Sequence, residues 1–361
     1  MKVMHIVHDL DYGGAQKMFV KTSEGLQRRG NTENVCCIIT DKKVLNSDIY
    51  GIKKITLNLP HITSFANSIM ATMFELPLLF WAVYNEKPDV LYTYYGPMDQ
   101  LFSSIIGKIL GKKTVTRKYG QEHIRSSFNR CVCKLNYMLT DRIVTIFTEG
   151  IAELSDIGIS KEKITYIPNG RYATKKTKSK NIAGIDKTDF VIGTVSRLTP
   201  IKNHVAVIDA ISKMKNKNIK FVIIGEGNYK KKLERTIKHK KLEENIIFIG
   251  ATENIMEIIS GFDVFVHPSF AEGCPNAVLE AMSCGLPVIA SDVGGHRDLL
   301  GDGTGVLVEP KDTKKLREWF EIFLENPELR KEYGKKAKEK IKNEFSLDIM
   351  LRKYEKLFEG L

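Results

Sequence analysis

The sequence contains few cysteines and no cysteine motif typical of a metal site. Its six cysteines among 361 residues form no CxxC pair, and no group of Cys and His has the spacing of a zinc site. This scarcity excludes a small protein stapled by disulfides. It is typical of thiols buried as small apolar side chains in a reducing compartment.

The sequence also lacks a clear membrane span. Its most apolar stretch, 65–84, is interrupted by Asn67, Glu75 and Pro77. We expect a helix that covers a core there, with an apolar face at a membrane surface as the alternative. Residues 1–8 are too short and too polar for the core of a secretion signal, so we expect a cytoplasmic protein.

Basic residues outnumber acidic ones. The chain has 55 Lys and Arg against 43 Asp and Glu, a net charge of +12, which suggests an anionic partner. We expect no nucleic acid, because the sequence has no recognition helix, zinc spacing or aromatic RNP-type strand. The basic excess is spread over both halves of the chain. Its clusters are either solvated helix faces or a surface attracted to anionic lipid headgroups.

Short apolar runs alternate with helical patterns along the chain. This alternation predicts βαβ units with parallel strands, and the absence of a short fixed repeat excludes a solenoid. The expected strands are 2–7, 34–40, 89–94, 113–116, 142–146, 190–195, 220–225, 246–250, 264–267 and 288–291. Together they predict an α/β fold of two Rossmann-like parallel-sheet domains facing a cleft, with ligands bound beyond the carboxyl ends of the strands.

The domain boundaries are expected where the composition changes. Residues 1–168 form the N-terminal domain and residues 188–340 the C-terminal domain. Between them, 169–187 lacks apolar periodicity and is rich in Lys, so we interpret it as a basic linker. Residues 341–361 are expected to form a C-terminal helix that packs back on the N-terminal domain.

A glycine pair, Gly13-Gly14, lies between the first strand and a helix. Glycines let the backbone approach a phosphate, and a helix N-terminus supplies N–H groups for it. The pattern is not GxGxxG, so it does not indicate a nicotinamide or flavin. Asp9 and Asp11 beside the pair spell DxD. We interpret them as part of the loop, so no metal site is expected.

Two cations lie five residues apart in a later loop. Arg197 and Lys202 follow the strand at 190–195, with Pro200 stiffening the loop between them. An Arg supplies a planar donor fork and a Lys a point charge, a suitable pair for a diphosphate. The alternative is two solvated surface cations.

Two carboxylates, Glu272 and Glu280, lie eight residues apart between two buried strands. We expect Asn276 to cap a helix that contains Glu280. The backbone N–H groups of Asn276, Ala277 and Val278 then form an anion site at the helix start. Glu280 lies about one turn into this helix, where a carboxylate suits the paired hydroxyls of a ribose.

In order and spacing, these motifs resemble those of the retaining glycosyltransferases of family 4, which belong to glycosyl transferases group 1 and have the GT-B fold. The resemblance rests on the glycine pair, the Arg-x4-Lys pair, the stretch 167–170, and Glu272-x7-Glu280 with the following 281–295. It implies that the N-terminal domain binds the acceptor and the C-terminal domain a nucleotide-sugar donor.

The resemblance also implies a role for each motif residue. Arg197 and Lys202 would hold the donor diphosphate, and Glu272 would contact the hydroxyls of the transferred sugar; these three are the expected catalytic residues. Glu280 would bind the ribose. The other expected donor-binding residues are Gly13, Gly14, Asn276, Ala277 and Val278, through their backbone N–H groups, with Gly225, Gly227 and Gly250 as weaker candidates for the nucleobase pocket.

The implied reaction needs no cofactor besides the nucleotide-sugar, UDP- or GDP-linked. Negative charge grows on the leaving phosphate, and fixed cations and helix dipoles stabilise it, so no metal is expected. The outcome typical of the family is retention, and the leaving phosphate itself can take the acceptor proton. The resemblance also implies that the transferred sugar is a hexose, so we expect a hexosyltransferase.

One motif departs from the family pattern. Many relatives carry a His after an N-domain strand, where this sequence has Thr116 to Gly120 without a His. His123 or Lys118 is the candidate to replace it on the acceptor side. Alternatively, cations of this segment meet an anionic acceptor; these are Arg117, Lys118 and Arg125.

The sequence thus predicts a glycosyltransferase that modifies a glycan or a lipid-linked sugar. From the resemblance we expect a bacterial cell-surface polysaccharide pathway (lipopolysaccharide, capsule or exopolysaccharide), with the enzyme peripheral on the inner face of the cell membrane. Two alternatives remain open: a sugar-nucleotide epimerase of the same architecture, and a non-catalytic basic protein that binds nucleotides or nucleic acid.

Overall fold

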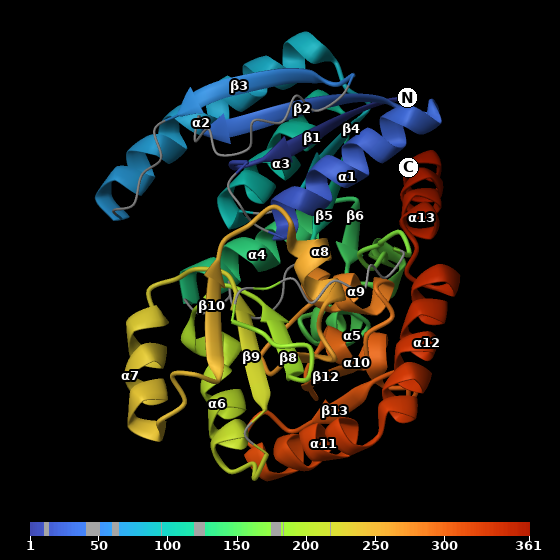
Figure 1. Cartoon of the computed structure of the whole chain (residues 1–361). Helices are drawn as coiled ribbons and strands as arrows, with labels where there is room; N and C mark the ends of the chain where they lie inside the picture. The colour runs from blue at the N-terminus through green and yellow to red at the C-terminus, as the bar shows by residue number, and fades with distance from the viewer. Residues whose placement is uncertain are drawn as a thin grey trace. The chain divides into compact units, whose positions relative to one another are not determined.

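A computed structural model of the 361-residue chain describes residues 1–10, 14–40, 51–59, 65–94, 96–118, 127–174, 182, 184–216 and 218–361. The chain divides into two compact units. The first unit comprises Met1–Pro168 and Met350–Leu361, and the second comprises Asn169–Ile349. Figure 1 shows the elements of each.

The first unit is built on a seven-stranded sheet whose strands are all parallel, in the order β3-β2-β1-β4-β5-β6-β7. Its strands are β1 (Lys2–Val7), β2 (Glu33–Thr40), β3 (Lys53–Leu59), β4 (Val90–Thr93), β5 (Lys113–Arg117), β6 (Arg142–Thr145) and β7 (Ile164–Tyr166). The helices between them are α1 (Gly14–Arg29), α2 (Phe65–Glu86), α3 (Pro97–Leu110), α4 (Ser127–Leu139) and α5 (Glu149–Asp156).

Alternate residues of a strand face opposite sides of this sheet. Met4 and Ile6 of β1 pack with Leu79 of α2 in one core cluster. His5, between them, faces the other side, where its ring centroid lies 6.1 Å from that of Phe19 in α1. Helices therefore cover both faces, as the burial of a parallel sheet requires.

The C-terminal helix α13 (Leu347–Glu359) contributes to the core of the first unit. The hydroxyl groups of Tyr354 in α13 and Tyr92 in β4 are 2.7 Å apart, and both side chains are fully buried. Arg29 of α1 pairs with Glu355 at 3.0 Å from Nε to Oε1.

The second unit is built on a six-stranded sheet, also parallel throughout, in the order β10-β9-β8-β11-β12-β13. Its strands are β8 (Phe190–Val195), β9 (Ile219–Ile224), β10 (Ile246–Gly250), β11 (Val264–His267), β12 (Val288–Ser291) and β13 (Val306–Val308). Its helices are α6 (His204–Ser212), α7 (Lys230–Lys240), α8 (Ile255–Ser260), α9 (Asn276–Ser283), α10 (Gly295–Leu300), α11 (Thr313–Glu325) and α12 (Pro327–Asn343).

The strand order reverses once in each sheet. In the second unit the chain runs outward from β8 through β9 to β10, then returns to β11 on the other side of β8 and continues to β13. Ligands of such sheets bind at the carboxyl ends of the strands beside this switch point. The expected fold of two parallel-sheet α/β domains is confirmed.

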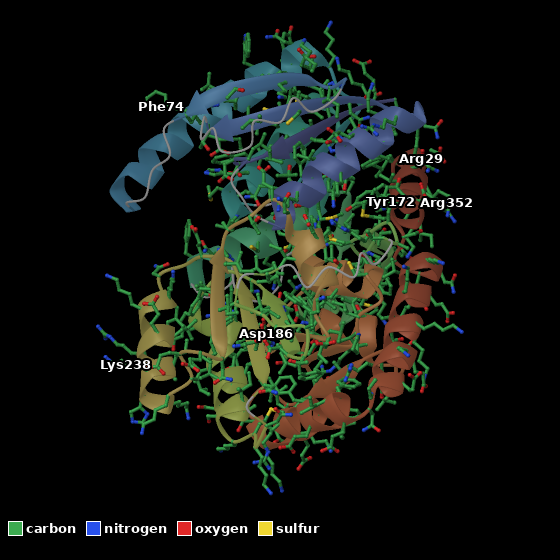
Figure 2. All side chains as sticks on the ribbon, viewed as in Figure 1. Arg29, Phe74, Tyr172, Asp186, Lys238 and Arg352 are labelled. Carbon is green, nitrogen blue, oxygen red and sulfur yellow. The ribbon has the colours of Figure 1, made fainter. Side chains whose placement is uncertain are left out.

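The apolar stretch 65–84 forms most of α2. Across the described part of the chain, no helix combines the length and the apolar character needed to span a bilayer. Phe74 of α2, labelled in Figure 2, is nevertheless 62% exposed, and Trp81 is 60% exposed.

Candidate active site

Two loops of the second unit bring the expected donor-binding residues to its switch point. The first loop follows β8 and carries Arg197 and Lys202; the second follows β11 and carries Glu272. The two loops are joined by a backbone hydrogen bond of 2.8 Å from Phe270 N–H to the Ile201 carbonyl. The site is therefore formed by neighbouring strands, as the motifs predict.

The carboxylate of Glu272 is the centre of this arrangement. Its Oε1 accepts from Lys202 Nζ at 2.5 Å and from His267 Nε2 at 2.9 Å. Burial alone would raise the pKa of Glu272, but His267 and Lys202 outweigh it and hold that pKa well below its usual range. Glu272 is thus an anion near pH 7.

Two further histidines, His296 and His204, lie near His267. The ring of His296 meets that of His267 edge-on, with centroids 5.3 Å apart, and its Nδ1 donates to the Ser291 carbonyl at 2.7 Å. Burial lowers the pKa of His296 to about 3 and that of His204 to about 4. Both rings are therefore neutral near pH 7.

Glu280 is paired with a residue that the sequence does not single out. Its Oε1 lies 3.0 Å from a terminal nitrogen of Arg171, and Glu280 is only 8% exposed. Arg171 is the third residue of the segment 169–187, which we expected to be a linker. Arg171 directly follows the motif stretch 167–170, and this adjacency is the sequence signal that could have identified it.

The start of α9 differs from the expectation. The N-cap residue is Pro275, not Asn276, and Pro275 supplies no side-chain hydrogen bond to the helix. Asn276 is the first helical residue, and its Oδ1 accepts from Asn169 Nδ2 at 3.0 Å, so the amide serves a different contact. The Val278 N–H donates to the Pro275 carbonyl at 3.2 Å, whereas Ala277 lies before the first N–H group that finds an acceptor within the helix.

Arg197 is exposed, and its guanidinium makes no hydrogen bond or ion pair within the described residues. Two glycines determine the path of its loop. A Cβ on Gly225 would lie 2.1 Å from the Ser196 carbonyl oxygen, and one on Gly227 would lie 2.3 Å from that of Leu198. The Gly225 N–H donates to the Gly250 carbonyl at 2.8 Å. All three expected glycines thus support the Arg197 loop.

Two expected residues of the first unit, Gly13 and His123, lie outside the described residues, as does Arg125. Gly14 is exposed at the start of α1. Lys118 is 2% exposed, forms an ion pair with Glu153 and lies 4.9 Å from the ring centroid of Phe147.

The first unit has its own group of polar residues at the switch point between β1 and β4. His8 Nδ1 lies 3.1 Å from Asp99 Oδ2 at the start of α3. Burial, and then the charge of Asp99 and a hydrogen bond to it, raise the pKa of Glu75 in α2 to about 10. A Glu within an otherwise apolar helix is the sequence signal for this group.

Within the described ranges, no three Cys, His, Asp or Glu side chains are grouped as a metal site requires.

Comparisons with known proteins find a family match within the second unit and related proteins that match most of the chain. Residues 175–340 match the family described as glycosyl transferases group 1. A Campylobacter jejuni protein, N-acetylgalactosamine-N,N'-diacetylbacillosaminyl-diphospho-undecaprenol 4-alpha-N-acetylgalactosaminyltransferase, is 28% identical over 264 residues, which cover 72% of this chain and 71% of the relative. UDP-Gal:alpha-D-GlcNAc-diphosphoundecaprenol alpha-1,3-galactosyltransferase of Escherichia coli is 28% identical over 267 residues, 68% of either chain.

The structural comparison covers both units. The crystal structure of Anabaena Alr3699/HepE in complex with UDP-glucose has a TM-score of 0.85 at 18% identity and covers 100% of both chains. The chain therefore has the GT-B fold, and its residues 175–340 match the glycosyl transferases group 1 family.

Proposed function

We propose that this protein transfers a hexosyl group from a nucleotide diphosphate to a lipid-linked sugar, with retention of anomeric configuration as in family 4. The observation that supports this most directly is the Glu272 carboxylate, held by Lys202 and His267, with the exposed Arg197 in the same loop as Lys202. UDP and GDP are the candidate nucleotides.

The donor would engage the two loops as follows. Arg197 meets the diphosphate from solvent, and Lys202, already next to Glu272, bridges the phosphate and the sugar end of the donor. Glu280, kept in place by Arg171, accepts hydrogen bonds from the ribose hydroxyls. Only one oxygen of Glu272 bonds to Lys202 and His267, so the other is available to a sugar hydroxyl.

The chemistry follows from where charge develops. The bond between the anomeric carbon and the phosphate oxygen breaks, and the leaving diphosphate gains negative charge that Arg197 and Lys202 stabilise. The acceptor oxygen bonds to the same face of the anomeric carbon, and its proton passes to the leaving phosphate. Because these two cations supply the positive charge, the proposal needs no metal ion.

The acceptor class comes from the relatives. The names of the two curated relatives describe transfer to sugars on diphospho-undecaprenol. We infer that this chain likewise acts on a sugar carried by a polyprenyl diphosphate, in cell-surface glycan synthesis.

A lipid-linked acceptor requires work at a membrane surface, and the first unit presents a suitable face. Four exposed apolar side chains form one stripe along α2: Phe74, Leu78, Trp81 and Tyr84. Aromatic side chains are enriched at the interface between lipid and water, and the net charge of +12 favours anionic headgroups. We propose peripheral binding to the inner face of the cell membrane.

The donor assignment is tested by thermal shift with UDP, GDP, ADP and their sugar conjugates, with and without EDTA. One nucleotide should raise the melting temperature selectively and equally in both conditions. Arg197→Ala should then lower kcat/KM by about 100-fold. Arg235→Ala removes an exposed Arg of α7 in the same unit and should change nothing.

Product analysis tests the rest of the proposal. NMR coupling constants of the product should show the anomeric configuration of the donor. Inversion would overturn retention, and full activity of Arg197→Ala would overturn the phosphate assignment. A shift that disappears with EDTA would contradict metal independence.

A further inference from the structure

The first unit contains a cavity of about 330 Å³ between α4 and α5, next to the carboxyl end of β5. This volume lies within the range of small-molecule sites. Its lining includes Arg130, Cys133 and Lys134 from α4, Leu154 from α5, and Lys118, which directly follows β5. None of the donor-binding residues contributes to it.

The walls of this cavity are apolar. Cys133 and Tyr137 on α4 are 7% and 4% exposed, and Leu154 on α5 is fully buried. Burial raises the pKa of both the Cys133 thiol and the Tyr137 phenol, as expected in surroundings that disfavour charge. Such walls offer few partners for sugar hydroxyls and suit a hydrocarbon chain.

The lining also carries an excess of positive charge. Lys118 is buried and paired with Glu153. Arg130 and Lys134 are exposed and lie one turn apart on α4. Among the described residues that line the cavity, three are therefore cations and one is a carboxylate. An apolar cavity with exposed cations beside it complements an amphiphile that has an anionic head and a hydrocarbon tail.

We propose that this cavity binds the first isoprene units of a polyprenyl diphosphate, with the diphosphate at Arg130 and Lys134. The proposal rests on the function proposed above and assigns the lipid part of the acceptor to a place in the first unit. The chain continues along the exposed apolar side chains of α4, which are Phe128, Leu135 and Met138.

Farnesyl diphosphate is a water-soluble probe of this site, and isothermal titration calorimetry gives its dissociation constant. We expect binding at least tenfold tighter than that of inorganic diphosphate or of farnesol, because each lacks one half of the amphiphile. Arg197→Ala should bind the probe as the wild type does, which excludes the donor diphosphate site as its location.

Matched variants locate the probe. Ile157→Trp fills the cavity from its rim, where Ile157 is 39% exposed, and should weaken binding at least tenfold. Ile109→Trp adds the same bulk at a 65% exposed position of α3 and should change it less than twofold. Arg130→Gln with Lys134→Gln should weaken binding tenfold and flatten its salt dependence, whereas Lys161→Gln should do neither.

The outcomes separate this proposal from the proposed function. If farnesyl diphosphate does not bind, or binds folded Ile157→Trp as tightly as the wild type, the cavity assignment is overturned. If Ile157→Trp raises the KM for an undecaprenyl-diphosphate-linked sugar and leaves that for the donor unchanged, both proposals gain support. If the probe binds in the cavity but no lipid-linked sugar is a substrate, the function is wrong and the cavity assignment stands.

Discussion

His267 donates a 2.9 Å hydrogen bond from Nε2 to Oε1 of Glu272, and this bond connects the last residue of β11 to the loop that follows it. Glu272 is also held through its backbone, because its carbonyl accepts from Gly295 N–H at 3.2 Å. Lys202 shares the same carboxylate oxygen. His267 therefore determines how Glu272 is oriented, and we infer that it is a positioning residue for donor binding.

His267→Ala should lower kcat by about tenfold to hundredfold, because Glu272 loses a fixed orientation. It should also raise the pKa of Glu272, since His267 opposes the effect of burial. Loss of activity on the acid side should then begin at a higher pH than in the wild type. The measurement is kcat and kcat/KM for transfer between pH 4.5 and 8.

His267→Gln is the matched variant, because its amide can donate to the same oxygen. It should recover most of kcat. A merely structural role would lower the melting temperature of both variants equally and leave the pH profile unchanged, which would contradict the positioning role.

The backbone of the Arg197 loop supports a second prediction. Gly225 has φ +136, and a Cβ there would lie 2.1 Å from the Ser196 carbonyl oxygen. Gly225→Ala should therefore lower the free energy of unfolding by about 2 kcal/mol or more and displace the loop. Urea unfolding and the affinity for the nucleoside diphosphate measure the two effects.

Gly303→Ala is the control for this prediction. Gly303 also has a positive φ, +80, but a Cβ there would meet no atom within 4 Å. Gly303→Ala should lower the free energy of unfolding by less than Gly225→Ala does, and it should leave the nucleotide affinity unchanged. If both variants lost the same free energy of unfolding, the backbone conformation alone, rather than the contact with the loop, would explain the effect.

The Arg171–Glu280 pair gives a third prediction. Arg171→Ala leaves a buried carboxylate without its cation, which should cost about 1–3 kcal/mol of unfolding free energy. The double variant Arg171→Ala with Glu280→Gln should recover part of that loss but not the nucleotide affinity. Additive losses in the double-mutant cycle would contradict a direct interaction.

The sequence predicts the central strands well. The expected strands 190–195, 264–267 and 288–291 coincide with β8, β11 and β12, because buried β-branched runs are recognised without knowledge of their neighbours. β3, β7 and β13 were not predicted. All three lie at an edge of their sheets; β3 mixes polar and apolar residues, and β7 and β13 have only three residues each, so none shows a clear apolar run.

The sequence singles out candidate site residues where a motif is local, and it misses those whose partner is remote. Glu272 and Lys202 were recognised by spacing, but their direct contact was not predicted. Arg171 was assigned to a linker, because its segment is cationic and its partner Glu280 lies far along the chain. Asn276 was wrongly expected to cap α9, because capping preference takes no account of Asn169, which uses its side chain.

The last prediction concerns Glu75 and pH. Its pKa is raised to about 10 in the folded protein by burial, then by Asp99, whereas an unfolded Glu titrates near 4.5. Above pH 4.5 the unfolded chain releases this proton and the folded chain keeps it, so stability falls as the pH rises toward 10.

Glu75→Gln is neutral in both states and can still donate to Asp99. Its unfolding free energy should therefore exceed that of the wild type by at least about 1 kcal/mol at pH 8, and the two should agree near pH 4.

Glu86, on the same helix, provides a control of opposite sign. A hydrogen bond from Lys53, only partly opposed by burial, and a second from Lys2 lower the pKa of Glu86. Its contribution to stability is present above pH 4.5 and is lost as the pH falls through the lowered pKa, so Glu86→Gln should be less stable than the wild type at pH 8. Urea unfolding of the three proteins at pH 4 and pH 8 tests both predictions. If Glu75→Gln were also destabilised at pH 8, the assignment of a neutral Glu75 that donates to Asp99 would be wrong.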